Sequence, residues 1–245
     1  YRAHATCKLC GHKLASLIHI IAACTVALAQ GRFTWRHDSV LNTILKPLFD
    51  HIQMVNSTAR KPVSAIKIAF VGAGAKCVKH SKKQPYEREH LLWSASDWKL
   101  LIDFTHKPIV FPPIICPTIQ RPDIVIYSTS TKTVIWAELT CPAEENICDA
   151  QVRKARRYAP LKLQCIAAGW TVHDFTIESG ARGCVANTVH TFLLKIGMKP
   201  QETNSLVRSV AFTTSRCTFA IFCASHHKLW SQHELLGGSD HWAEF

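Results

Sequence analysis

The sequence predicts an α/β or α+β fold in which helices flank a mixed β-sheet. Apolar runs typical of strands occupy residues 98–104, 123–127 and 133–139, a helix-compatible stretch covers 144–168, and an alternating run follows at 170–177. Strands followed by a crossing helix and a further strand are typical of a sheet with both parallel and antiparallel neighbours. Nearly half of the 245 residues are hydrophobic (47%), so the chain can bury a substantial core.

The patterns divide the chain into four parts. These are a small zinc module (1–30), a helical linker with a basic loop (31–95), a main α/β domain (96–230) and a tail without a motif (231–245).

The spacing of cysteine and histidine predicts zinc in the first part. The pattern Cys-x2-Cys-x8-His-x4-Cys is formed by Cys7, Cys10, His19 and Cys24. Three thiolates and one imidazole complete a tetrahedral structural Zn²⁺ site, and a module this small needs its metal to fold. His12 and His4 are alternative nitrogen ligands, and three incidental cysteines are the alternative to a metal site.

The linker is predicted to contain one helix. Helical spacing extends over 38–55, with Asp38 or Ser39 as the N-cap and Pro47 as a kink or a break. The polar and mostly basic stretch 76–90 is either a solvated connection or a contact to a DNA backbone.

Turn and helix signals organise the main domain. Its second and third strands are joined by the short turn 128–132, which predicts a hairpin. The helix that follows contains Pro160, which weakens its middle, and Gly169 is expected just after its end. Two further helices are predicted, at 186–197 and 205–230.

Two acids and a lysine give this domain a candidate catalytic site. Asp123 precedes the second strand and Glu138 lies in the third, so a hairpin brings them to one end of the sheet. Two carboxylates bind Mg²⁺ or Mn²⁺, and such a metal lowers the pKa of a water that attacks a phosphodiester. Lys154 in the next helix would stabilise the developing charge, and Tyr158 lies one turn further on the same face.

A purely structural role is the alternative for these acids. Asp123 after Pro122 is an ordinary residue for the start of a strand. Glu138 lies within an apolar strand, where an ionised carboxylate is costly unless it is paired or binds a metal. On spacing alone, both interpretations stay open.

At these residues the sequence resembles a known family. The stretch from Cys7 to about Trp230 resembles the C-terminal part of site-specific non-LTR retrotransposon proteins. In that part, a CCHC zinc knuckle precedes a restriction-like endonuclease of the PD-(D/E)XK superfamily. The matching motifs are the zinc ligands and residues 31–38 (GRFTWRHD), 96–98 (SDW), 121–123 (RPD), 138–142 (ELTCP), 153–154 (RK) with Tyr158, and 181–183 (ARG).

The resemblance implies a restriction-endonuclease-like fold and an enzyme that nicks target DNA, so that the exposed 3′ end primes reverse transcription. It assigns metal binding to Asp123 and Glu138. It assigns the catalytic lysine to Lys154, because Thr140 occupies the usual lysine position and the family lets the lysine move to the following helix.

The resemblance also implies a setting for the chain. Accessory roles fall to Glu144, Glu145 and Tyr158. The partners would be DNA and element RNA in the nucleus, and the chain would belong to a larger reverse transcriptase polyprotein. No reverse-transcriptase motif is present, so polymerase activity is not expected in this chain.

The charge balance favours a polyanionic partner. Lys and Arg number 29 against 17 Asp and Glu, a formal charge of +12, which suggests nucleic acid first and an anionic membrane surface second. The apolar run 14–29 is too short to span a bilayer. The candidates for contacts with nucleic acid are Arg32, Arg36, His37, Lys79, Lys82, Lys83, Arg121, Arg153 and Arg157.

Two other functions stay open. One is a catalytically inactive, zinc-containing remnant that binds nucleic acid, and the other is a structural zinc protein that binds a protein partner. The eleven cysteines are odd in number and scattered, so we expect a reducing, intracellular environment in which those after residue 30 are mostly buried.

Overall fold

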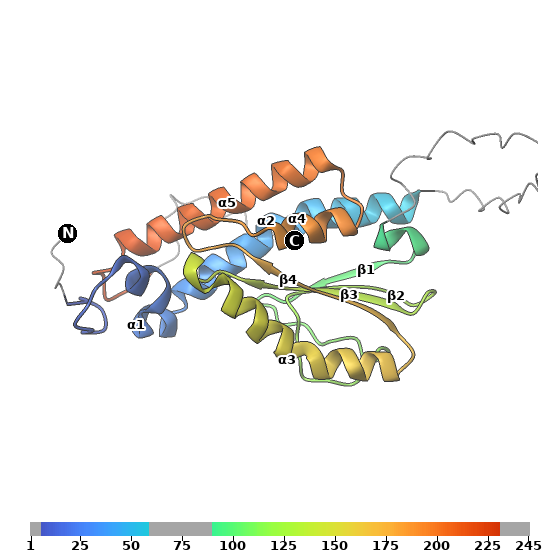
Figure 1. Ribbon diagram of the computed structural model, residues 1–245, viewed down its shortest axis with the longest axis horizontal. Coiled ribbons are helices and arrows are strands. Elements are labelled where there is room, and N and C mark those ends of the chain that lie inside the picture. The colour runs from blue at the N-terminus through green and yellow to red at the C-terminus, as the bar shows by residue number, and fades with distance from the viewer. Residues whose placement is uncertain (1–5, 59–89, 231–245) are drawn as a thin grey trace, which may run out of the picture.

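The computed structural model describes residues 6–58 and 90–230, which form a four-stranded mixed sheet flanked by helices (Figure 1). The predicted mixed α/β class is confirmed at this level. In chain order, the elements are a π-helical turn (His19–Ala23), α1 (Thr25–Ala29), α2 (Arg32–Ser57), a 3₁₀ turn (Leu91–Ser94), β1 (Lys99–Ile102), β2 (Ile124–Ser128), β3 (Thr133–Thr140), a 3₁₀ turn (Glu144–Asn146), α3 (Ile147–Ala167), β4 (Thr171–Glu178), α4 (Asn187–Lys195) and α5 (Pro200–Cys223).

The sheet has the strand order β1-β2-β3-β4. β1 and β2 pair antiparallel, β2 and β3 form the predicted hairpin, and β4 returns parallel to β3 after α3 has crossed the sheet. Trp136 on β3 pairs with Val125 on one side and with Asp174 on the other. β3 is therefore a central strand, and all eight of its residues are buried.

Asp97 fixes the turn of the hairpin. Its carboxylate accepts hydrogen bonds from the hydroxyls of Ser128 and Ser130, both at 2.6 Å, and from the amides of Thr129 and Ser130, at 3.1 and 2.9 Å. Burial alone would raise the pKa of Asp97, but these hydrogen bonds hold it well below its usual value. The clamp sets the register of β2 against β3, on which the position of the two candidate acids depends.

Different helices cover the two faces of the sheet (Figure 1). On one face, Leu161 and Cys165 of α3 pack against Val125 and Trp136. On the other face, residues of α2, α4 and α5 pack against a set of strand residues that includes Ile124, Ile126, Ile135 and Ala137. Successive strand residues point to opposite faces, so β2 and β3 contribute to both clusters.

Helix α2 is part of the main core and not a linker. It begins at Arg32 and not at residue 38, directly after Gly31, whose φ of 72° lies in the left-handed region. Pro47 lies inside the helix without ending it, at the cost of one backbone hydrogen bond. The fully buried residues of α2 include Val40, Leu41, Ile44 and Leu48. The predicted boundary between linker and main domain therefore does not separate two cores.

The later helices differ from prediction mainly at their ends. α3 is continuous through Pro160, and Gly169 follows it with a φ of 80°, as predicted. α5 starts at Pro200 and not at residue 205, because proline is well tolerated in the first turn of a helix. The predicted basic loop, apart from His90, and the tail 231–245 lie outside the described residues.

Burial of the later cysteines is only partly as predicted. Among the described cysteines after residue 30, Cys116, Cys165 and Cys217 are buried, whereas Cys148, Cys184 and Cys223 are exposed. Within residues 6–58 and 90–230, none of the helices has the length and hydropathy that crossing a membrane requires.

Candidate functional site

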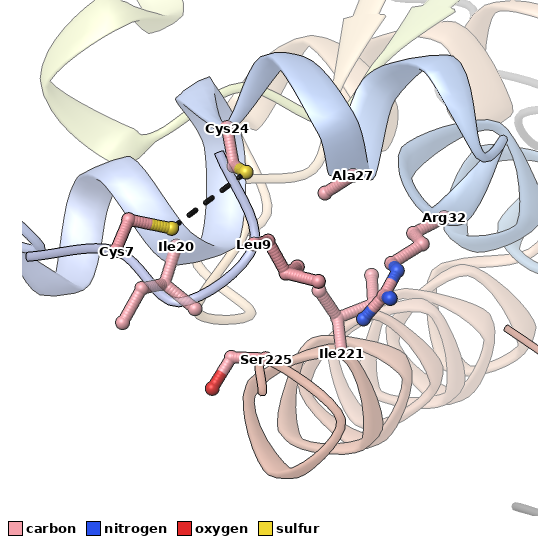
Figure 2. Close-up of a pocket in the computed structure, with 8 residues that line it drawn as sticks. All are labelled: Cys7, Leu9, Ile20, Cys24, Ala27, Arg32, Ile221 and Ser225. Atoms are coloured by element: carbon pink, nitrogen blue, oxygen red, sulfur yellow. Dashed lines mark hydrogen bonds between the residues drawn. The ribbon is translucent and has the colours of Figure 1, made fainter. Parts of the chain in front are cut away.

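Four side chains of the N-terminal module come together as a candidate zinc centre. The ligand atoms of the predicted set, Cys7, Cys10, His19 and Cys24, all lie within 4.8 Å of one another. The sulfur atoms of Cys7 and Cys24 are 4.0 Å apart (Figure 2), and Cys10 Sγ lies 3.2 Å from His19 Nε2. Sulfur ligands about 2.3 Å from a tetrahedral Zn²⁺ are about 3.8 Å from each other, so this cluster could hold a zinc ion.

A tight turn places the first two cysteines. Gly11, with a φ of 73°, donates its amide to the Cys7 carbonyl at 2.9 Å. Burial works to raise the pKa of Cys7, but backbone hydrogen bonds from Cys10 and Leu9 outweigh it and lower that pKa. A lowered pKa favours the thiolate, which is the form that binds metal.

His19, and not His12, completes the ligand set. The ring of His12 stacks on that of His19, with centroids 4.7 Å apart, so His12 lies beside the cluster. Burial, and next the charge of His12, lower the pKa of His19, which favours the neutral, metal-binding imidazole. The other alternative, His4, lies outside the described residues.

Arg36 joins the N-terminal module to the main domain. Its guanidinium donates to the carbonyls of Ile21 and Cys141, both at 2.8 Å, and to the Thr218 hydroxyl at 2.9 Å. The residue is 1% exposed, and burial lowers its pKa. The predicted contact of Arg36 with nucleic acid is therefore wrong, because its side chain is enclosed by protein.

Arg32 has a similar role and corrects the same prediction. It is fully buried and donates to the carbonyls of Ala224 and His227, both at 2.7 Å. Its guanidinium lies 4.9 Å from the centre of the Trp230 ring, and Figure 2 shows it beside Ile221 of α5. This arginine fastens the start of α2 to the end of α5.

The hairpin brings Asp123 and Glu138 together. The Asp123 amide donates to Glu138 Oε2 at 3.3 Å, and Asp123 Oδ2 accepts a hydrogen bond from the Leu139 amide at 2.7 Å. Asp123 is 8% exposed and Glu138 is 3% exposed. Burial, and next the charge of Asp123, raise the pKa of Glu138, while Lys154 acts in the opposite direction. Two buried carboxylates this close need a cation to stay ionised together.

Two residues of α3 reach this pair. Lys154 forms an ion pair with Oε1 of Glu138. Tyr158 is buried, and its hydroxyl donates to the Arg121 carbonyl at 3.0 Å. Burial, and next the charge of Glu138, raise the pKa of Tyr158, so its hydroxyl stays neutral. Tyr158 thus positions the backbone that leads into Asp123.

The two carboxylates are the residues of this site that could hold a hard divalent cation. Among the described residues, both hydrogen bonds of the Asp123 carboxylate fall on Oδ2, which leaves Oδ1 for a ligand. Glu138 adds a second carboxylate. Such oxygens are the ligands that Mg²⁺ prefers, with water and phosphate in the remaining positions.

His37 belongs to this site and was predicted only as a contact to nucleic acid. It extends from α2, with Nε2 3.3 Å from Asp123 Oδ2 and Nδ1 3.1 Å from Asp38 Oδ1. Burial alone would lower the pKa of His37, but the hydrogen bonds and charges of the two carboxylates raise it to about 10. Both ring nitrogens are engaged by carboxylates, so in this structure His37 is a partner of the acids, and its phosphate contact stays a prediction.

A rim of exposed arginines lies beside the acids. Arg121 has a side chain that is 48% exposed, with Nε 3.7 Å from Asp103 Oδ2. Arg153 and Arg157 are exposed on α3, and Arg157 lies over the Tyr158 ring at 5.5 Å. These three keep the accessibility that a phosphate contact needs. The other predicted contacts, Lys79, Lys82 and Lys83, lie outside the described residues.

The predicted accessory acids Glu144 and Glu145 are used elsewhere. They form ion pairs with Arg182, in which Nε lies 2.8 Å from Glu144 and Nη2 lies 2.8 Å from Glu145. A Cβ on Gly180 would lie 2.6 Å from Glu144 Oε1, so glycine lets this carboxylate close onto the loop. Their role in the described structure is to hold residues 180–183.

Glu178 is a buried acid that sequence reasoning missed. It ends β4 in register with Thr140 and accepts hydrogen bonds from Gln151 at 2.9 Å and Thr188 at 2.6 Å. Its place next to the end of β3 follows from the parallel pairing of β3 and β4. The only signal in the sequence was an acid at the end of an apolar strand.

No model of a known protein family matches the chain, and no curated protein matches it. The function proposed for the site therefore rests on its geometry and chemistry, together with the motif resemblance.

Proposed function

We propose that the chain is a metal-dependent DNA endonuclease with a restriction-endonuclease-like fold. The observation that supports this most directly is the convergence of Asp123, Glu138 and Lys154 at one end of the β2–β3 hairpin. Two carboxylates and a lysine, beside exposed arginines, are the groups that phosphodiester hydrolysis requires. The family resemblance extends the proposal to nicking of target DNA for target-primed reverse transcription.

Each side chain has a distinct role in this proposal. Asp123 and Glu138 hold Mg²⁺ or Mn²⁺, which when bound supplies a Lewis acid and a water of lowered pKa. Lys154 brings a positive charge to the place where negative charge develops on the phosphate. Arg153 and Arg157 bind flanking phosphates, which gives affinity but no sequence information.

The larger setting belongs to the same proposal. The N-terminal module would bind one structural Zn²⁺ and stabilise the start of α2 through Arg36, which donates to the Ile21 carbonyl. The enzyme would act in the nucleus on DNA, with element RNA as a second partner, as a section of a larger reverse transcriptase polyprotein.

A nucleic-acid-binding protein without catalysis is the second candidate, and one observation favours it. Asp123 and Glu138 each already have a cationic partner, His37 and Lys154. These partners provide the charge balance for which a metal would otherwise be needed. Such a protein would bind DNA with a steep salt dependence and would not cut it.

Nicking of supercoiled plasmid distinguishes the two candidates. The full chain is incubated with plasmid in Mg²⁺, Mn²⁺ or EDTA, beside Asp123→Asn and Glu138→Gln, which preserve side-chain shape. The matched control is Asp174→Asn on β4, an acid whose side chain is 33% exposed and pairs with Lys162 at 2.6 Å.

The endonuclease predicts metal-dependent nicking that falls about 100-fold or more in both site variants and persists in the control. Binding measured by gel shift in EDTA should survive in all variants. A wild-type chain that binds DNA yet does not nick it in either metal would establish the second candidate.

A further inference from the structure

The segment that leads into Asp123 exposes an isoleucine. Ile119 is 97% exposed, compared with 72% for Val110 and 65% for Ile114 in the same segment. Single exposed aliphatic residues are common on protein surfaces. The position of Ile119 is informative because of how its flanks are held and what surrounds it.

The segment before Ile119 is anchored in the core. Phe111, Ile115 and Cys116 are buried and pack in the same cluster as residues of α3. Pro117 then restricts the backbone just before the exposed tip.

The segment after Ile119 is tied to α3. The Gln120 side chain donates to the Arg157 carbonyl at 3.0 Å, and the Tyr158 hydroxyl donates to the Arg121 carbonyl at 3.0 Å. The Gln120 amide also donates to the Thr118 hydroxyl at 3.1 Å. An apolar side chain with fixed flanks loses little conformational entropy when it enters a partner.

Chain length limits the distance between Ile119 and the acids. The four residues from Ile119 to Asp123 span at most about 14 Å. Successive bases of a DNA strand rise by about 3.4 Å, so this span corresponds to about four base steps. A phosphate at the carboxylates would have its neighbouring base steps within reach of Ile119.

The charges around the tip select the kind of partner. Arg121, two residues after Ile119, and Arg157, whose carbonyl accepts from the Gln120 side chain, are both exposed, so the partner has an anionic exterior. An exposed isoleucine near these two arginines suits a partner that also has an apolar interior. A DNA duplex, with phosphates outside and stacked bases inside, has both properties, and isoleucine is among the residues that enter base steps as wedges.

We infer that Ile119 is an apolar wedge that enters the base stack of DNA beside the candidate cleavage site. The inference rests on the proposed DNA function and adds a contact that opens the duplex near the scissile phosphate. Unstacking a base step is unfavourable, and the wedge would offset this cost by its own contact with the bases.

Permanganate oxidation of thymines tests the wedge directly, because it detects unstacked bases without requiring cleavage. Linear duplex DNA is bound in EDTA by the full wild-type chain, by Ile119→Ala, by the conservative Ile119→Leu and by the loop control Ile114→Ala. We expect new thymine reactivity in the wild-type complex, a loss of about tenfold in Ile119→Ala, and retention in the other two variants.

Nicking provides the second readout. Ile119→Ala should nick fully paired DNA about tenfold more slowly than wild type. Its nicking rate should recover on DNA with a two-nucleotide bulge, because the bases there are already unstacked. If Ile119→Ala has the same permanganate reactivity and the same dependence on the bulge as wild type, the wedge role is wrong, while the endonuclease proposal is unaffected. Ile119-dependent reactivity without any nicking would support the wedge and remove the endonuclease.

Lipid vesicles test the other partner that has an anionic exterior and an apolar interior. The same variants are sedimented with vesicles of phosphatidylserine and phosphatidylcholine. If vesicle binding depends on Ile119 but the permanganate reactivity of the DNA does not, the residue contacts a membrane surface and the inference is wrong. Vesicle binding that is weak or independent of Ile119 is the expected result.

Discussion

The Nε2 atom of His37 lies 3.3 Å from Oδ2 of Asp123, although the two residues are 86 positions apart in the sequence. The second acid, Glu138, is paired with Lys154 from α3. Each carboxylate of the candidate site thus has one basic partner, and the two partners come from helices on opposite faces of the sheet. Each basic partner opposes the electrostatic repulsion between the two buried carboxyl groups.

Replacing His37 should cause a loss of stability that depends on pH. Its pKa is raised from 6.5 to about 10, so its stabilising contribution is fully present below pH 6.5 and disappears as the pH rises through about 10. His37→Gln should therefore have a lower free energy of unfolding than wild type at pH 6.5, and this difference should become smaller towards pH 10. Urea unfolding across this pH range measures the difference. A difference in unfolding free energy between His37→Gln and wild type that stays constant over this pH range would contradict a charged imidazole.

Replacing Arg36 should affect stability and not DNA binding. Arg36→Met removes three hydrogen bonds and leaves the Ile21 and Cys141 carbonyls without their donor, so we expect a loss of about 3 kcal/mol or more. The exposed Arg153→Gln should change stability by about 0.5 kcal/mol or less and reduce the slope of log binding constant against log salt by about 0.9. Urea unfolding and salt titration of DNA binding separate the two. A reduced salt slope for Arg36→Met at unchanged stability would restore its predicted phosphate contact.

The purified chain should contain one zinc ion, and Cys24→Ser should lose it. Structural zinc is worth about 10–16 kcal/mol in small zinc-finger peptides at pH 7, so its loss should unfold the module. The melting temperature should also fall, because Arg36 connects Ile21 of this module to Cys141. Elemental analysis and a melting curve provide the readouts, with the exposed Cys148→Ser as the control. Full zinc content in Cys24→Ser would argue against the tetrahedral set.

Asp97→Ala should loosen the β2–β3 hairpin and cost about 2 kcal/mol near neutral pH, since several hydrogen bonds to a charged group are lost. The pKa of Asp97 is lowered from 3.8, so its contribution is present above that value and is lost as the pH falls below it. The gap between Asp97→Ala and wild type should therefore be smaller at pH 3 than at pH 7 in urea unfolding. Asp50→Ala, which removes an exposed pair with Lys46, should change little at either pH. An equal cost at both pH values would exclude the charge as the source.

The hairpin and the cluster of four candidate zinc ligands could be predicted because their signals are local. Alternation, β-branched residues and a short polar turn placed β2 and β3, and the hairpin then brought Asp123 and Glu138 to the same end. The four zinc ligands lie within one short segment, so their spacing already limits how they can fold. Lys154 followed from the crossover helix that joins two neighbouring strands.

The place of α2 could not be predicted in the same way. Its start has a left-handed glycine and no side-chain cap, so Asp38 and Ser39 looked like better beginnings. Arg32 and Arg36 lie four residues apart in line with Val40, a periodicity that predicts a buried stripe, yet arginine is usually exposed. Their burial depends on carbonyls that lie far away in the sequence. The place of His37 in the site could not be predicted for the same reason, since its partner Asp123 lies 86 residues away in the sequence.

The parallel return of β4 has a consequence for how this protein can be recombined. Helix α3 connects β3 directly to β4, so the two acids, the lysine and the tyrosine all fall within residues 121–178. A chimera that exchanges this block moves them as one cassette, together with the arginine rim. His37 lies on α2, outside this block, so the protein that receives the block would have to supply a counter-charge for Asp123. The block would thus carry the proposed catalytic residues, whereas the counter-charge of Asp123 would come from the recipient.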